Sequence, residues 1–299
     1  MRKWFVYTGL STLLLLVSCE EVIQVEVPVD TPRLIVDGLI RVDERQPFIP
    51  VRIALTESNG FFDEIPVTRA ENIIIQTERF DPEGNLIETL VSSLAEEAPG
   101  TGVYIPDPDA TFDQRIPTVF LDERVRFTLQ IRHRGRQYLA QTHYVPTVPI
   151  AFLLQGRATL FEGDETEVIV AFTDPPGRGD NYLFDFGPQK FLVTQDTFYD
   201  GQFFQFSYFY EDPIEPGTEL EISIMGSDAT FYNYMDLLLE QSEGNQGPFQ
   251  TPVATVRGNV VDVTGIDNED QVDNADRPDV FPLGYFAIVQ EFRSSLTIQ

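Results

Sequence analysis

The sequence predicts a mainly β protein, with an N-terminal immunoglobulin-like β-sandwich followed by a second mainly β domain that contains one helix. Three observations indicate this fold class. Apolar and polar residues alternate over many short segments, turn formers separate those segments, and a single segment has helical spacing. Strands that follow one another without intervening helices indicate antiparallel sheets rather than a parallel α/β fold.

The first domain is expected over residues 33–147. Over residues 125–131 every second residue is apolar, which is the pattern of a half-buried strand. Arg134 and Gly135 then turn the chain into a second strand, which Pro146 ends. The other strands expected in this domain are residues 34–40, 48–55, 73–80, 86–91 and 136–144.

The second domain is expected over residues 148–299, because Pro146 and Pro149 mark a boundary between two strand-rich regions. Its strands have the same alternating pattern as those of the first domain. They are expected at residues 166–172, 182–186, 191–198, 203–210, 219–225, 253–263 and 285–292.

One helix is expected in this domain, and either Ser227 or Asp228 suits its N-cap. Gly244 lies just beyond its expected end. Its apolar residues recur with a spacing of three or four, so they share one face. They are Phe231, Tyr234, Met235, Leu238 and Leu239. Such a face predicts a helix that packs on the core.

Residues 1–18 have the layout of a secretory signal peptide, since Arg2 and Lys3 precede an apolar run. That run is shorter than the ~20 residues that a transmembrane helix needs. The segment Leu-Val-Ser-Cys ending at Cys19 resembles the lipobox of bacterial lipoproteins. Cys19 is the only cysteine of the chain, so no internal disulfide competes for it. We expect an acylated Cys19 and a tether over residues 19–32.

Two acidic residues, Glu20 and Glu21, directly follow Cys19. They resemble the export signal that sends lipoproteins of Bacteroidota to the cell surface, and a solvated linker is the alternative. The expected location is therefore the outer membrane, with a lipid anchor and display at the cell surface. The periplasmic face of the same membrane is the alternative location.

The charge of the chain restricts its partners. It has 48 acidic and 20 basic residues, and its net charge is −28 at pH 7. Recognition of nucleic acid relies on basic surface, so nucleic acid is excluded as a partner. An anionic macromolecule would also be repelled at long range.

The residues themselves do not indicate an enzyme. Only His133 and His143 offer imidazoles, and a strand histidine is more often structural than catalytic. Lys190 is the only lysine after the signal, and no Gly-x-Ser-x-Gly segment is present. The sequence predicts a protein that is not an enzyme and that carries no cofactor.

The aromatic strand at residues 203–210 is a candidate binding surface. Because side chains alternate along a strand, four aromatic residues share one of its faces. They are Phe204, Phe206, Tyr208 and Tyr210. A core-facing strand is the favoured interpretation, and a stacking surface for a peptide, a glycan or a partner protein is the alternative.

An acidic segment further along the chain is a weak calcium candidate. Its carboxylates are Asp267, Glu269, Asp270 and Asp273. Calcium prefers such oxygen ligands, but the spacing and the glycine of an EF-hand loop are missing. A solvated loop is favoured, so no metal site is predicted.

Several segments together resemble one protein family, and they occur in the order in which that family has them. The segments are residues 34–38, 70–75, 138–146, 172–175, 181–182, 232–234, 258–260 and 283–286. The family is the Bacteroidota domain-of-unknown-function family 4249, whose members are outer-membrane or surface lipoproteins. The chain departs from it at residues 262–279, which are acidic where the family is often glycine-rich.

The resemblance implies association with a TonB-dependent outer-membrane transporter, and it supplies no catalytic residue. We therefore expect an accessory or binding lipoprotein that takes part in nutrient capture. A surface carbohydrate-active or peptide-active enzyme is one alternative. An adhesin that uses the Arg-Gly-Asp tripeptide at residues 178–180 is another.

Lipidation is directly testable. Metabolic labelling with a palmitate analogue should mark the wild-type protein and should not mark Cys19→Ala, because the thiol is the expected attachment site. Fluorescence of the labelled band in a gel measures the result. Label retained by Cys19→Ala would contradict the prediction.

Overall fold

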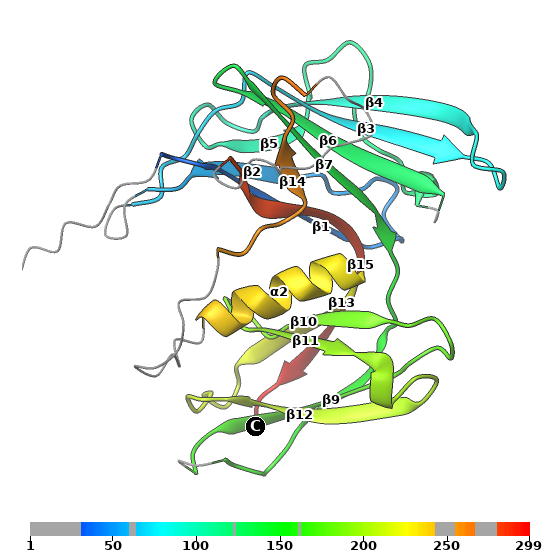
Figure 1. Ribbon diagram of the computed structural model, residues 1–299. Coiled ribbons are helices and arrows are strands. Elements are labelled where there is room, and N and C mark those ends of the chain that lie inside the picture. The colour runs from blue at the N-terminus through cyan, green and yellow to red at the C-terminus, as the bar shows by residue number, and fades with distance from the viewer. Residues whose placement is uncertain (1–30, 60–63, 122–123, 161–162, 243–254, 267–279) are drawn as a thin grey trace, which may run out of the picture. The chain divides into compact units, whose positions relative to one another are not determined.

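The computed structural model describes residues 31–59, 64–121, 124–160, 163–242, 255–266 and 280–299. Within them, residues 32–58 and 65–299 form one compact unit. This unit is mainly β, and its described residues contain one α-helix (Figure 1). No helix in the described part of the chain is both long and apolar enough to cross a membrane.

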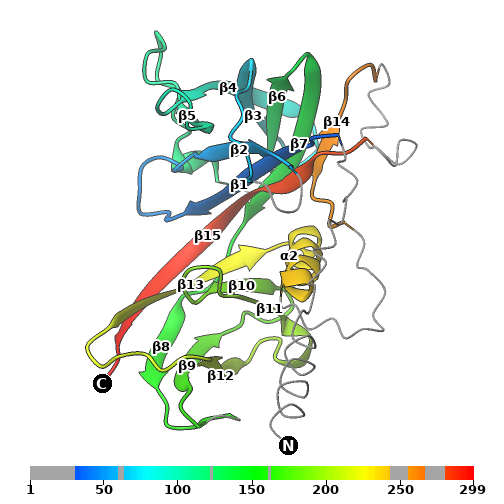
Figure 2. The same cartoon turned by 90° about the vertical axis from the view of Figure 1, so that its left-hand side faces the viewer.

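Eight strands close into a mixed β-barrel (Figure 2). They are β1 (Leu34–Val42), β2 (Ile53–Glu57), β3 (Asn72–Phe80), β4 (Leu86–Glu96), β5 (Val103–Pro106), β6 (Val125–His133), β7 (Arg136–Val145) and β15 (Leu283–Thr297). The order around the barrel is β15-β1-β2-β5-β4-β3-β6-β7, and β7 pairs again with β15. β15 is parallel to both of its neighbours in the barrel, and the other pairs are antiparallel.

The expected immunoglobulin-like sandwich over residues 33–147 is therefore not what these strands form. β15 comes from the C-terminal end of the chain and lies between β1 and β7, which closes the sheet on itself. Local alternation specifies which face of a strand is buried, but it does not specify which distant strand pairs with it. A short strand, β14 (Val260–Asp262), also pairs with β7.

The barrel interior is apolar, as the alternation predicts. Val125, Phe127, Leu129 and Ile131 of β6 all point inward and are buried. Burying each such side chain contributes about 1.5–3 kcal/mol to the free energy of unfolding. The turn from β6 to β7 has positive φ at both of its central residues, which matches a two-residue hairpin turn.

The second half consists of two packed sheets. One has the order β11-β10-β13-β15 and the other the order β12-β9-β8. Their strands are β8 (Ile150–Gln155), β9 (Thr166–Thr173), β10 (Asn181–Asp185), β11 (Phe191–Gln195), β12 (Phe203–Tyr210) and β13 (Glu219–Ser227). The core between the sheets is aromatic, since the ring of Phe172 on β9 lies 5.0 Å from Tyr182 and 5.7 Å from Phe184 on β10.

Helix α2 (Ala229–Ser242) covers the other face of the four-stranded sheet. Asp228 is its N-cap, because the Asp228 carboxylate accepts a hydrogen bond of 2.7 Å from the backbone N–H of Phe231. Phe231 and Met235 are buried against the sheet, as the sequence predicts. Leu238 differs from the prediction, since 39% of it is exposed. Gly244 lies outside the described residues.

Asp200 and Gly201 form a residue pair that suits a type I′ hairpin turn, but the link between β11 and β12 is not a hairpin. β11 pairs with β10, whereas β12 pairs with β9, so the link joins two different sheets. It contains a short 3-10 helix, η3 (Asp196–Phe198). Of Asp200 and Gly201, only Gly201 has positive φ, whereas a type I′ hairpin needs positive φ at both.

β15 belongs to both halves of the unit. Its residues from Leu283 to Gln290 pair with β1, and its residues from Glu291 to Thr297 pair with β13. The sequence places a domain boundary between residues 147 and 148, and that boundary stays a prediction. The chain passes from one half to the other along β15 as well as after β7.

Two phenylalanines on opposite faces of β12 test which face is core. Phe206→Ala should lower the free energy of unfolding by about 2–4 kcal/mol, because the ring packs 5.1 Å from Phe184 and truncation leaves a cavity. Phe203→Ala is the matched control, with 56% of the residue exposed, and it should cost less than about 1 kcal/mol. Urea unfolding measures both values. An unchanged midpoint for Phe206→Ala would show that this face is not core.

Candidate functional site

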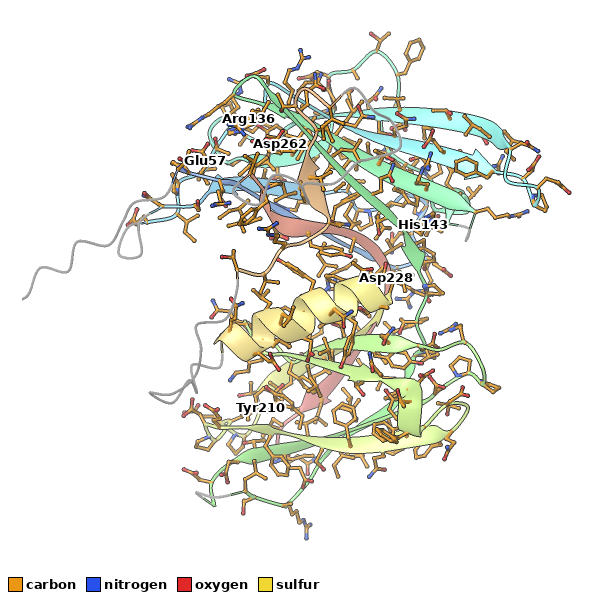
Figure 3. The ribbon with its side chains drawn as sticks, in the orientation of Figure 1. Glu57, Arg136, His143, Tyr210, Asp228 and Asp262 are labelled. Carbon is orange, nitrogen blue, oxygen red and sulfur yellow. The ribbon has the colours of Figure 1, made fainter. Side chains whose placement is uncertain are left out.

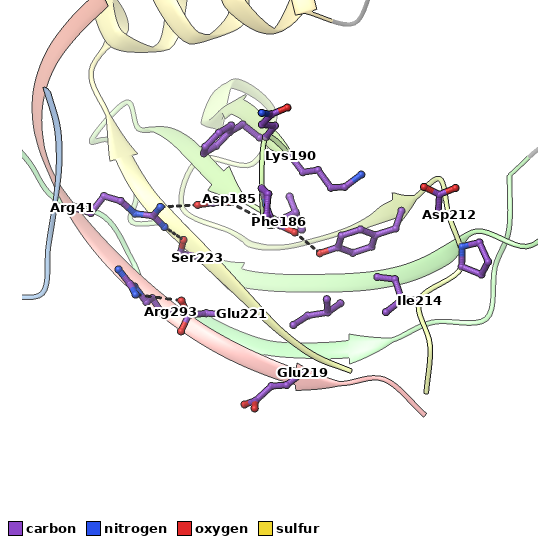
Figure 4. A pocket seen from close by; sticks show the side chains of 17 residues that line it. Arg41, Asp185, Phe186, Lys190, Asp212, Ile214, Glu219, Glu221, Ser223 and Arg293 are labelled. Carbon is purple, nitrogen blue, oxygen red and sulfur yellow. Dashed lines mark hydrogen bonds and ion pairs between the residues drawn. The ribbon is translucent and has the colours of Figure 1, made fainter. Parts of the chain in front are cut away.

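A pocket of about 630 Å³ lies where β1 meets the four-stranded sheet (Figure 4). Its walls come from β1, β10, β11, β12, β13 and β15, together with the turn after β10 and the segment after β12. We call it the Arg41 pocket. Its polar and aromatic residues used below are Arg41, Lys190, Tyr210, Asp212, Glu219 and Arg293.

An ion network forms one side of the Arg41 pocket. Arg41 donates three hydrogen bonds. They run from Nε to Glu291 Oε1 (2.8 Å), from Nη1 to Asp185 Oδ2 (2.7 Å) and from Nη2 to Ser223 Oγ (2.6 Å). Arg293 donates 2.8 Å to the other oxygen of Glu291. The network thus joins β1, β10, β13 and β15 at one point.

Glu291 is the centre of this network, with only 3% of its side chain exposed. Burial alone would raise the pKa of Glu291, but the hydrogen bonds from Arg293 and Arg41 outweigh burial and lower that pKa. The carboxylate therefore stays ionised and holds both guanidinium groups in place. Their fixed positions shape the pocket wall.

Lys190 stands on the opposite wall. It ends the tight turn after β10, in which Gly187 and Gln189 both have positive φ, and Gly187 accepts a hydrogen bond of 3.0 Å from the Lys190 backbone N–H. The Lys190 ammonium lies 5.8 Å from the ring centroid of Tyr210. No carboxylate among the described residues forms an ion pair with it. This ammonium is therefore available to a ligand.

The floor of the pocket is apolar and its rim is acidic. The Tyr210 hydroxyl donates a hydrogen bond of 2.8 Å to the carbonyl of Phe186, which fixes the ring. Burial raises the pKa of Tyr210. Ile214 completes the floor. Asp212 and Glu219 are exposed and place carboxylates at the rim.

Apolar walls with a few separated polar groups are typical of small-molecule sites. The Arg41 pocket offers an ammonium on one wall, carboxylates at the rim and aromatic and aliphatic surface between them. Its lining contains neither histidine nor cysteine, and Ser223 is bonded to Arg41.

The candidate aromatic surface lies on the inner face of β12. Tyr208 stacks on Phe186 at 3.7 Å, and Phe204 stacks on Tyr199 at 4.1 Å. Phe204, Phe206 and Tyr208 therefore pack on the core between the sheets. Only Tyr210 of this set lines the Arg41 pocket.

The remaining candidate residues lie outside the described part of the chain. They are Cys19, Glu20, Glu21, Asp267, Glu269, Asp270 and Asp273. Lipidation and export therefore remain predictions from the sequence, and the calcium site remains a weak candidate.

A different acidic group forms where the links β9–β10 and β11–β12 meet. Oxygens of Asp174, Asp196 and Asp200 all lie within 4.8 Å of one another. Backbone N–H groups bind two of these carboxylates. The N–H of Gly201 donates a hydrogen bond of 2.8 Å to Asp174, and the N–H of Asp180 donates one of 2.6 Å to Asp196. The group ties the two links together.

The Arg-Gly-Asp tripeptide is part of the same links. Arg178 Nε donates a hydrogen bond of 2.6 Å to the carboxylate of Asp180, and the hydroxyl of Tyr182 donates one of 3.0 Å to the same carboxylate. The two charged ends of the tripeptide thus bind each other.

The two histidines do not act as a pair. His133 lies beside Glu57, and Figure 3 shows that Glu57 and His143 are far apart on the barrel. His133 is buried, and its Nε2 lies 2.8 Å from Thr68 Oγ1 and 3.3 Å from Glu57 Oε1. Burial lowers the pKa of His133. A nucleophile–histidine–carboxylate relay uses both ring nitrogens, whereas here both neighbours meet Nε2.

Three of the segments that carry the family resemblance meet in the barrel wall. The Asn259 side chain donates a hydrogen bond of 2.8 Å to the carbonyl of Phe286 and accepts one of 2.9 Å from the backbone N–H of Phe286. A Cβ on Gly284 would lie 1.9 Å from the carbonyl oxygen of Val36, so only glycine fits there. These segments therefore have structural roles.

Comparison with known proteins adds no relative. No protein-family model matches the chain, and no curated protein matches it.

The sequence reasoning missed most of the Arg41 pocket. Arg41 interrupts an apolar strand, and this was the only local signal, because its partner Glu291 is 250 positions away. Lys190 stands out in the sequence only because it is the sole lysine after residue 3.

The ion network should depend on pH with a defined sign. The folded-state pKa of Glu291 lies below its ordinary value of 4.5, so its stabilising contribution is fully present above pH 4.5 and is lost as the pH falls through the folded-state pKa. Glu291→Gln should lower the free energy of unfolding by about 2–3 kcal/mol at pH 7, because it removes the buried carboxylate that both guanidinium groups share and leaves Arg41 with Asp185 as its only carboxylate partner.

The difference between wild type and Glu291→Gln should shrink below pH 4.5, as measured by urea unfolding over a pH series. Glu221→Gln is the matched control, since Glu221 also pairs with Arg293 but 61% of its side chain is exposed. Equal losses in both variants would show that Glu291 does not anchor the network.

Proposed function

We propose that this protein is a non-enzymatic, membrane-anchored binding lipoprotein that captures a small zwitterionic ligand in the Arg41 pocket. The ligand class is an amino acid or a short peptide with an apolar side chain. One observation carries the proposal: the Lys190 ammonium, which has no ion-pair partner in the described chain, faces a pocket with an apolar floor and an acidic rim.

Each part of such a ligand has a counterpart in the pocket. A ligand carboxylate would bind the Lys190 ammonium, and a ligand ammonium would bind Asp212 or Glu219 at the rim. The ring of Tyr210 and the side chain of Ile214 would take the apolar side chain. Bound water could complete the remaining polar contacts.

The net charge of the chain also favours a zwitterion. At −28 the protein repels an anionic ligand at long range, whereas a zwitterion carries no net charge and is not repelled. The local ammonium of Lys190 can then select the carboxylate at short range.

The anchor and the partner complete the proposal. Acyl chains on Cys19 would hold the protein at the outer membrane, and Glu20 and Glu21 would direct it to the cell surface. The partner would be a TonB-dependent transporter, which the family resemblance supports. Confinement to one membrane raises the effective concentration, so a modest interface would suffice. Crosslinking in intact cells, with an unrelated surface lipoprotein for comparison, tests this partnership.

The ligand is tested by removing one charge. Isothermal titration with a set of dipeptides should find ligands with apolar side chains, and Lys190→Gln should weaken their binding tenfold or more, which is about 1.4 kcal/mol or more. Arg69→Gln is the matched control, because it removes one exposed positive charge outside the pocket. Equal affinity in the wild type and Lys190→Gln would contradict the proposed site.

A further inference from the structure

We propose that the open edge of β12 is a docking site for an extended segment of a partner protein, which adds to the sheet as a β-strand and has basic residues on both sides of an uncharged centre. The open edge is defined as residues 203–207. This inference depends neither on the ligand of the Arg41 pocket nor on the lipid anchor.

β12 is the outermost strand of its sheet. It pairs with β9 alone, and the order β12-β9-β8 places its other side away from the sheet (Figure 2). The register with β9 runs from Phe203 opposite Thr173 to Tyr210 opposite Thr166 without a bulge. Alternate backbone groups of such an edge point outward and form a template for another strand.

The open edge has none of the features that usually block such pairing. Proteins protect edge strands with charges, prolines, bulges or very short length. Residues 203–207 contain no charged residue, no proline and no glycine. By contrast, β14 is short, and β8 has a bulge between Ile150 and Phe152. An unprotected edge is explained by a partner that covers it.

The outer face of the same sheet offers apolar contacts to an added strand. Phe203 is 56% exposed, and its ring lies 6.1 Å from that of Phe152 on β8. Phe198, just before β12, is 92% exposed. Side chains of an added strand that point to this face would extend the apolar surface of Phe203.

The charges around the open edge specify the ends of the partner segment. Asp200 precedes β12, Glu211 follows it, and both are exposed. A segment with basic residues at both ends would pair with these carboxylates. A second copy of this chain in antiparallel pairing would place Asp200 against Glu211 of the copy. Like charges would then face each other, so a copy is disfavoured.

The test uses a fluorescent synthetic peptide in which threonine and valine alternate between two pairs of lysines. The protein is the mature chain with Cys19→Ala, which removes the acyl attachment site. Fluorescence anisotropy should show binding, and hydrogen exchange should slow at the amides of β12. A peptide with glutamates in place of the lysines should bind at least tenfold more weakly, and one with a central proline should not bind.

Gln205 supplies the matched pair of variants, since it is exposed in the middle of the open edge. Gln205→Lys should weaken binding of the lysine-flanked peptide at least tenfold, whereas Gln205→Thr, which stays uncharged, should bind like the wild type. Both variants should melt like the wild type, because the position is exposed.

Three results would overturn the proposal. One is binding of the peptide without slower exchange in β12, and another is equal binding of the proline-interrupted peptide. The third is a dimer that forms with rising protein concentration and slows exchange in β12 without any peptide. In that case a second copy of the chain would be the occupant.

Discussion

The shared strand β15 is the constraint on which the rest of the structure depends. Its first part closes the barrel between β1 and β7, and its second part is the edge of the four-stranded sheet. Glu291 stands where the strand changes partners, and it binds Arg41 from the barrel and Arg293 from β15 itself. A buried carboxylate without these partners would be costly, so the ion pairs and the strand pairing support each other.

The Arg41 pocket follows from that crossing. Arg41 belongs to a barrel strand, yet its guanidinium reaches Asp185 on β10 and Ser223 on β13, so the barrel supplies one wall and the second half of the chain supplies the others. Lys190 is placed by a turn of the same sheet, whose conformation depends on Gly187 and not on the barrel. The locked wall and the available ammonium therefore have separate origins, and a ligand could pair with Lys190 without breaking the network.

Much of the local structure could be predicted from the sequence, because it depends on short-range patterns. The alternation over residues 125–131, the turn at Arg134 and Gly135, and the capping by Asp228 each involve neighbouring residues. Barrel closure and the Arg41 pocket could not be predicted, since they join residues far apart in the sequence. The aromatic strand β12 shows the difference. Its core-facing side was predicted correctly, but its pairing with β9 was not predicted.

The two proposed surfaces would suit opposite requirements on one acidic protein. With a net charge of −28, long-range forces attract cationic partners and leave neutral zwitterions unaffected. A strand with basic ends would be drawn to the carboxylates beside β12, whereas a small zwitterion would reach the Arg41 pocket by diffusion and be held by short-range contacts. Salt should therefore weaken association at the open edge more than binding in the pocket, because screening acts mainly on exposed charges. The excess of carboxylates would then serve to attract the partner while the single available ammonium selects the ligand.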